Sequence, residues 1–179
     1  SMMIGFIVFS SLITLFFYLI NGRVDKKYLY ASIATLLTGI YYSDYLVYGY
    51  IGLPYFAYKK IIIGSLFVGV GFYSHVIGAY FSIKAIRWLG NITFASILTM
   101  IILSPDMVVF KQMYTYGYFL ILLNVVAWLW VSLINIRKRF VAYIFSIGFM
   151  VIGIYGGITV LMDFFGGYFQ FNSPVFYIS

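Results

Sequence analysis

The sequence predicts an all-α integral membrane protein: one domain, residues 1–179, folded as a bundle of about six transmembrane helices. Three observations lead to this fold class. Of the 179 residues, 64% are hydrophobic and only 8% are charged, whereas a soluble domain carries about 25% charged residues to keep its surface wet. The mean hydropathy is +1.05. The apolar runs also lack the polar/apolar alternation of a lumen-lined β-strand.

Each apolar run is close to the length of about 20 residues with which a helix crosses a bilayer core. The predicted spans are residues 3–20, 28–48, 60–81, 88–104, 116–136 and 141–164. After them, Asn172-Ser173-Pro174 has the composition of a helix start and is followed by apolar residues. We therefore expect a seven-helix bundle truncated before its last span. A short external tail is the alternative.

The basic residues predict the orientation of these spans. Cytoplasmic loops carry the excess of Lys and Arg. Eight of the 11 basic residues follow the first, third and fifth spans, namely Arg23, Lys26, Lys27, Lys84, Arg87, Arg137, Lys138 and Arg139. The other side has Lys59, Lys60 and Lys111. We expect a multi-pass protein of a bacterial inner membrane with its N-terminus outside. Because the basic residues sit in small groups between spans, they do not indicate nucleic-acid binding.

No catalytic constellation is visible in the chain. It has no Cys, no Glu and a single His. This composition argues against disulfides and thiol nucleophiles, and against metal sites, since zinc needs three or four protein ligands. All lysines lie near the predicted span ends. We therefore expect that this chain is not an enzyme and holds no metal or cofactor.

Candidate ligand-binding residues lie at two depths. His75 is predicted near the middle of the third span, and an intramembrane ionisable residue is a functional-site hypothesis. A neutral His that hydrogen-bonds a neighbouring helix is the alternative. Asp44, Asp106 and Asp163 fall at the predicted external span ends, where Tyr45 and other tyrosines gather. They predict either an outward-facing cup for a cationic or hydroxylated small molecule, or ordinary anchoring at the membrane interface.

Small residues recur at helical spacing in two spans. Gly71, Ser74 and Gly78 follow one another in the third span, and Gly153 and Gly157 form a pair in the sixth. Such stripes let helix backbones approach closely. They predict helix packing, with a hinge or a homodimer face as the alternatives.

Four segments carry a resemblance that covers nearly the whole chain. They are Gly5 with the turn Asn21-Gly-Arg-Val-Asp-Lys-Lys27-Tyr-Leu-Tyr30, Leu103-Ser-Pro105-Asp-Met, Arg137-Lys-Arg139-Phe-Val-Ala142 leading into Ile147-Gly148-Phe149, and Phe171-Asn-Ser-Pro174. With the spans in this order, the chain resembles the membrane region of bacterial seven-transmembrane receptors with diverse intracellular signalling modules. These are patterns of hydrophobicity, glycine and turn charge, with no catalytic signature.

The resemblance implies a sensory, signal-transducing domain whose cytoplasmic output domain lies outside this chain. It carries over no catalytic residue. The alternative function is the substrate-binding subunit of a small-solute, vitamin-type membrane transporter. Against that alternative, the first span lacks an Ala-rich stripe for a transporter partner, and both termini are predicted outside. A structural assembly subunit is a third class.

Overall fold

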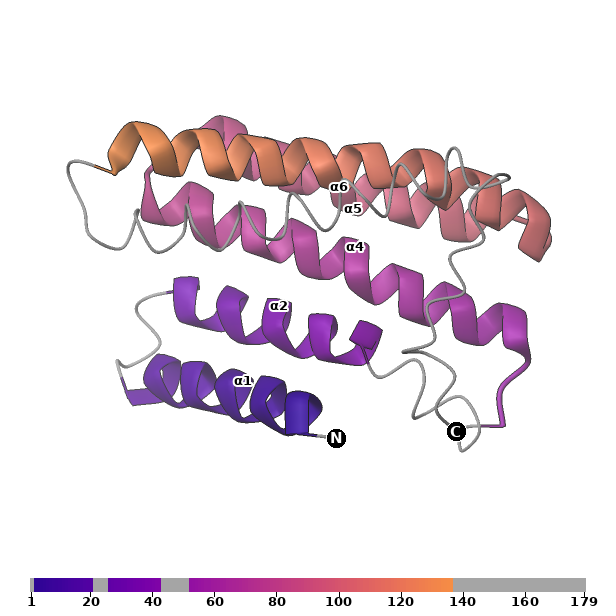
Figure 1. Cartoon of the computed structure of the whole chain (residues 1–179), viewed down its shortest axis with the longest axis horizontal. Coiled ribbons are helices and arrows are strands. Elements are labelled where there is room, and N and C mark those ends of the chain that lie inside the picture. The colour runs from indigo at the N-terminus through magenta and orange to yellow at the C-terminus, as the bar shows by residue number, and fades with distance from the viewer. Residues whose placement is uncertain (1, 21–25, 43–51, 137–179) are drawn as a thin grey trace.

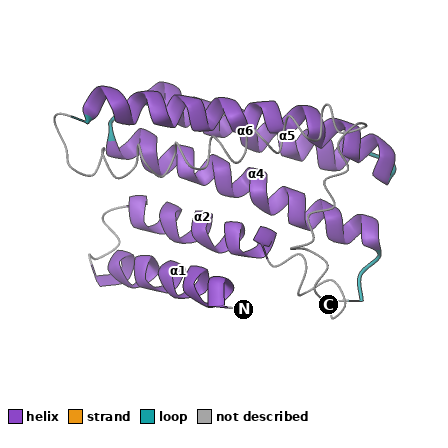
Figure 2. Cartoon of the chain, in the orientation of Figure 1, coloured by secondary structure: helices purple, strands orange, loops and turns teal. Residues whose placement is uncertain are grey.

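A computed structural model describes residues 2–20, 26–42 and 52–136 of the chain. In these residues the secondary structure is helical, with short connecting turns and no strand (Figure 2). The helices are α1 (Met2–Ile20), α2 (Lys26–Tyr42), α4 (Tyr55–Tyr80), α5 (Lys84–Leu103) and α6 (Met107–Asn135). The predicted all-α class is therefore confirmed for this part of the chain.

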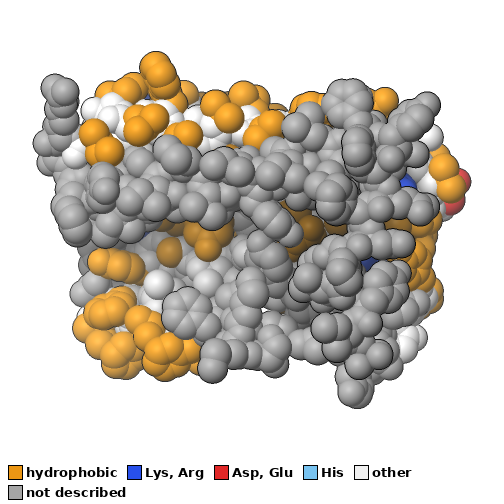
Figure 3. Space-filling model, in the orientation of Figure 1, with side chains coloured by type: hydrophobic (Ala, Val, Ile, Leu, Met, Phe, Trp, Pro, Cys, Tyr) orange, Lys and Arg blue, Asp and Glu red, His pale blue; other side chains and the backbone are white. Residues whose placement is uncertain are grey.

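Three of the described helices, α4, α5 and α6, are long and apolar enough to cross a membrane. The shorter apolar stretch Val8–Ile20 lies in α1, and α2 has 17 residues. The described helices follow the order of the first five predicted spans, but the number of candidate spans is smaller than the predicted six. The predicted sixth span and the segment after it lie outside the described residues. The described surface visible in Figure 3 is mostly hydrophobic, as a lipid-facing surface requires.

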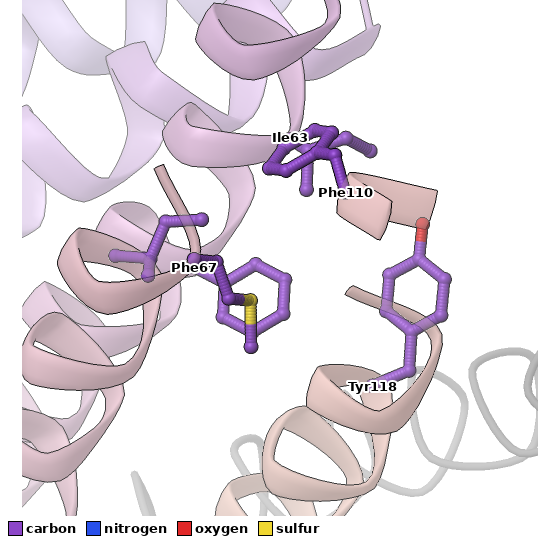
Figure 4. Close-up of a cluster of buried hydrophobic side chains, with 6 residues drawn as sticks. Ile63, Phe67, Phe110 and Tyr118 are labelled. Carbon is purple, nitrogen blue, oxygen red and sulfur yellow. The ribbon is translucent and has the colours of Figure 1, made fainter. Parts of the chain in front are cut away.

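The helix α4 lies between two helix pairs (Figure 1). On one side it contacts α2, which in turn contacts α1, and on the other side it contacts α5 and α6. One hydrophobic cluster joins Ile63 and Phe67 of α4 to Phe110 and Tyr118 of α6 (Figure 4). A second cluster contains Ile77 and Trp128 and lies further along the same helices.

All five described helices begin earlier than the spans predicted for them, most of all α4 and α6, where polar residues belong to the helix rather than to a loop. The third span was predicted from residue 60, but α4 begins at Tyr55, directly after Pro54. The fifth was predicted from residue 116, but α6 begins at Met107, where Asp106 is the N-cap and accepts a hydrogen bond from Val109 N at 2.9 Å. With 29 residues, α6 is about 43 Å long and exceeds a bilayer core of about 30 Å. The helix is therefore longer than a single crossing of the hydrocarbon requires.

The turn from α4 to α5 has a residue in the left-handed region. Ser82 has a φ of 61°, which favours glycine because a Cβ is crowded there. The next residue, Ile83, donates its backbone N–H to Gly78 O at 2.8 Å. This bond is the long hydrogen bond of a Schellman motif, which satisfies a carbonyl at the helix end. The tight turn places the start of α5 directly against the end of α4.

Hydroxyl groups in the apolar helices are satisfied largely by their own backbone. In lipid, an unpaired polar group costs several kcal/mol, and a Ser or Thr hydroxyl can bond the carbonyl of the preceding turn. Such bonds are made by Thr14, Thr35, Thr38, Ser65, Thr93, Ser96, Thr99 and Thr115. Between α1 and α2, Ser11 and Ser32 each donate to the other's carbonyl at 2.9 Å. These side chains are thus compatible with a lipid environment.

Candidate functional site

A buried polar cluster, formed by Ser74, Thr93, Asn124 and Trp128, joins α4, α5 and α6. Ser74 Oγ donates to Asn124 Oδ1 at 2.6 Å, and Asn124 Nδ2 donates to Thr93 Oγ1 at 2.9 Å. Trp128 Nε1 donates to Ser74 Oγ at 2.9 Å. The Ser74, Thr93 and Asn124 residues are 0% exposed. Three helices are therefore tied together by side-chain hydrogen bonds away from solvent and lipid.

The polar groups of this cluster are all satisfied. Thr93 Oγ1 donates to Leu89 O at 2.9 Å, and Asn124 Nδ2 also reaches Leu120 O at 2.8 Å. A buried network of this kind is stabilising only when each member has its partners, because an unpaired group in a low-dielectric interior is costly. Rotation or sliding of α4 or α6 would break at least two of these bonds at once, and movement of α5 would break the bond from Asn124 to Thr93. The cluster therefore specifies the relative register of α4, α5 and α6.

Glycines bring α4 and α5 close enough for the cluster to form. A Cβ built on Gly90 would lie 2.8 Å from Gly71 O, and one on Gly71 would lie 2.4 Å from Phe94 Cε1. A Cβ on Gly78 would lie 2.6 Å from Arg87 Cγ. The predicted packing residues Gly71, Ser74 and Gly78 are thus all buried against neighbouring helices. The predicted pair Gly153 and Gly157 lies outside the described residues.

His75 lies nearer to one end of its helix than predicted. It precedes Tyr80, the last residue of α4, by five positions (80 − 75) in a helix of 26 residues. Its Nε2–H tautomer donates to Asn91 Oδ1 of α5 at 3.0 Å. The ring also stacks on Phe94 at 5.7 Å and lies 5.6 Å from the Tyr30 ring of α2. His75 is therefore half-buried in aromatic contacts between three helices, in the half of α4 that leads to Lys84.

The opposite end of the α4–α6 group carries a lysine bound to helix carbonyls. Lys60 Nζ donates to Ile101 O at 2.9 Å and to Ser104 O at 3.0 Å, and lies 4.2 Å from the centroid of the Phe56 ring. The last carbonyls of a helix have no partners in their own helix and carry partial negative charge. Lys60 on α4 therefore stabilises the C-terminal end of α5. Asp106, two residues after Ser104, is exposed and caps α6.

The structure does not bring the predicted ligand-binding residues together. Asp106 lies at the end of the bundle where α4 begins, whereas His75 lies towards the end where α4 stops. Asp44, Tyr45 and Asp163 lie outside the described residues, so the predicted external cup stays a prediction. Over residues 2–20, 26–42 and 52–136, no group of three or more His, Asp or Glu side chains could hold a metal ion.

Sequence reasoning missed the buried polar cluster apart from Ser74, which it assigned to helix packing, with a hinge or a homodimer face as the alternatives. Asn124 provided a signal, because it is an amide in the middle of the predicted span 116–136, where polar residues face partner helices. Its partners Thr93 and Trp128 have no comparable signal, since Thr and Trp are frequent in membrane helices. The carbonyl contacts of Lys60 also could not be read from the sequence, because they depend on how α4 and α5 cross.

Comparison of the chain with protein-family models, with curated proteins and with solved structures gave no match. The described residues form an all-helical arrangement in which three helices are long and apolar enough to cross a membrane. Side-chain hydrogen bonds of a buried polar cluster join these three helices.

Proposed function

We propose that the chain is the membrane-embedded sensory domain of a bacterial receptor of the seven-transmembrane type, and that it relays an external stimulus to a cytoplasmic output domain. Signal transfer through a bundle needs helices that move together and that have discrete, rather than continuous, arrangements. The coupling of α4, α5 and α6 through the buried polar cluster is the observation that carries this proposal.

The contacts along α4 support a path from one membrane face to the other. At its first turns, Lys60 binds the end of α5. Further along, Ser74 and Asn124 join α4 to α6, and at the far end Arg87 lies over Gly78. A ligand that displaces the Lys60 end would shift hydrogen bonds of all three helices together. A hydrogen bond between two side chains is either formed or broken, with no stable intermediate geometry. The buried polar cluster that joins α4, α5 and α6 therefore suits a response with two discrete states.

The charge bias supports the direction of transfer. In the proposed orientation the Lys60 and Asp106 end faces outward and the turn holding Lys84 faces the cytoplasm. With the six predicted spans the chain would end outside, so a cytoplasmic output would require one further span. The proposal therefore expects a seventh helix and a signalling domain encoded after Ser179.

Two measurements test the proposal: the coding sequence beyond codon 179, and the identity of any small molecule that co-purifies with the protein. We expect an apolar span of about 20 residues followed by a kinase, cyclase, phosphatase or similar domain. A stop codon directly after codon 179 would contradict the proposal, and so would a continuation without a signalling domain. Mass spectrometry of a solvent extract of the purified protein distinguishes the sensory domain from the transporter subunit. A small-solute importer subunit would retain its solute at about one molecule per chain.

A further inference from the structure

A row of hydrogen-bond donors runs along the first turns of α5. Lys84 is the first residue of this helix, and Arg87 and then Asn91 follow it at steps of three and four positions. Residues at these spacings are neighbours on one face of a helix, with about 5–6 Å between successive Cβ atoms. The row presents an ammonium, a guanidinium and a carboxamide, all of which carry N–H donors. Two neighbouring members of the row can therefore reach one anionic group.

The two cationic side chains of this row have no partner among the described residues. Neither Lys84 nor Arg87 makes a hydrogen bond or an ion pair there. The chain has four carboxylate side chains, of which Asp106 alone lies in the described residues, and it caps α6 beyond the other end of α5. The planar guanidinium of an Arg matches the oxygens of a carboxylate or a phosphate. The positive charge of the row is thus available to an anion from outside the described chain.

Contacts with α4 hold two members of the row in place. A Cβ built on Gly78 would lie 2.6 Å from Arg87 Cγ and 3.1 Å from Arg87 N, so the stem of Arg87 passes directly over the bare backbone of α4. Asn91 Oδ1 accepts a hydrogen bond from His75 Nε2 at 3.0 Å, which leaves the N–H groups of Asn91 Nδ2 without a partner among the described residues. Donors that are positioned before a ligand arrives lose less conformational entropy when it binds.

The same face of α5 continues as an exposed apolar surface. Leu98 and Ile102 follow Asn91 along the row and are 59% and 69% exposed, and Trp88, beside Arg87, is 67% exposed. The row therefore changes from cationic donors to apolar side chains along a helix that is long and apolar enough to cross a membrane. A phospholipid has the same order of chemical groups, a phosphate followed by acyl chains. A soluble phosphate would use only the first part of the row.

We propose that Lys84, Arg87 and Asn91 bind the phosphate group of an anionic phospholipid, with an acyl chain along Leu98 and Ile102. Arg87 provides paired N–H donors for the phosphate oxygens, Lys84 adds a second positive charge, and Asn91 Nδ2 adds a neutral donor. Basic groups at the ends of membrane helices recognise lipid headgroups in this way. A zwitterionic headgroup brings its own cation, which repels the two cationic side chains. This site does not depend on the proposed sensory function.

Lipid titration of the purified chain in detergent micelles, followed by native mass spectrometry, tests the choice of ligand. Phosphatidylglycerol and phosphatidylcholine with the same acyl chains are compared, and inorganic phosphate is added as a competitor. We expect phosphatidylglycerol to bind with about tenfold higher affinity than phosphatidylcholine, as one additional charge-assisted hydrogen bond provides, and to remain bound in the presence of inorganic phosphate. Equal affinity for the two lipids would overturn the proposal. Displacement by inorganic phosphate would also overturn it, because the site would then be one for a soluble anion.

Variants of the full chain test the residues. Arg87→Gln removes the charge but keeps part of the stem, and Lys111→Gln is the matched control, which removes one positive charge from an exposed position on α6. We expect R87Q to bind phosphatidylglycerol about tenfold more weakly, and K111Q to bind it as the native chain does. Asn91→Leu should weaken binding about threefold, since one neutral hydrogen bond is lost.

Far-UV circular dichroism checks that each variant keeps its helices, and the comparison of lipids on the native chain stands without any variant. If R87Q and K111Q bind phosphatidylglycerol equally well, Arg87 does not hold the headgroup and the proposal fails.

Discussion

Replacing Asn124 with Ala should destabilise the α4–α6 group more than any other loss of one amide in the described residues. The change removes three hydrogen bonds, to Ser74 Oγ, Thr93 Oγ1 and Leu120 O. At about 0.6 kcal/mol for a hydrogen bond in a membrane protein, the three contribute about 2 kcal/mol. The space left by the amide adds about 1 kcal/mol, because the surrounding helices relax only in part. We expect a total loss of about 3 kcal/mol.

The assay is SDS-induced unfolding of the purified chain in mixed micelles, followed by circular dichroism. Asn135→Ala is the matched control on the same helix, because among the described residues the Asn135 amide donates to Val131 O of α6 itself and to no other helix. That variant should lie within about 0.5 kcal/mol of the native chain. The single variants Ser74→Ala and Asn124→Ala and their double variant form a cycle, which should give a coupling energy of about 0.6–1.7 kcal/mol. Equal stability of N124A and N135A, or a cycle with no coupling, would refute the role of the cluster.

Three further substitutions test individual contacts by the same unfolding assay. Gly90→Ala should lower the free energy of unfolding by about 1–3 kcal/mol, because the added Cβ would lie 2.8 Å from Gly71 O and force two backbones apart. Gly64→Ala is the control and should be tolerated, since its Cβ would lie 3.4 Å from Ile101 Cδ1. Lys60→Met should lower the free energy of unfolding by about 1–2 kcal/mol, because the carbonyls of Ile101 and Ser104 at the end of α5 would lose their hydrogen-bond donor. Lys111→Met is the control at an exposed position and should have little effect. Asp106→Ala should cost about 1 kcal/mol, while Asp106→Asn keeps the cap and should be nearly neutral; equal losses in the two Asp106 variants would show that the charge, not the cap, is the stabilising group.

Hydrophobicity predicted the helical class and the order of the elements because it acts over whole segments. A run of apolar residues is incompatible with water whatever its neighbours are, so the runs around residues 60–81 and 88–104 could be recognised without a structure. The helix starts were predicted less well, because the third span was started at Lys60 itself and Lys111 was assigned to a loop. A lysine tolerates a membrane helix when its long side chain reaches the interface or, as for Lys60, a neighbouring carbonyl.

The site was harder to predict because it depends on pairs of residues from different helices. His75 stood out as the single His of the chain, but its depth was misjudged, because it lies closer to the end than to the middle of α4. Asn124 and Thr93 lie 31 positions apart in sequence, and nothing in either span indicates that they meet. Glycine spacing indicated close packing around Gly71, yet it could not show that the partner surface would be Gly90 and Phe94.

The membrane orientation is the claim on which the proposed direction of signalling depends, and cysteine accessibility tests it most directly. Because the chain has no native Cys, single cysteines can be introduced at Pro54 and Asp106, and at Lys84 in the turn between α4 and α5. An impermeant thiol reagent applied to intact cells should label the cysteines at 54 and 106 and spare the one at 84 until the membrane is permeabilised. Labelling of position 84 alone in intact cells would reverse the orientation. Labelling of all three positions would show that α4 and α5 do not cross the membrane, and would contradict the account.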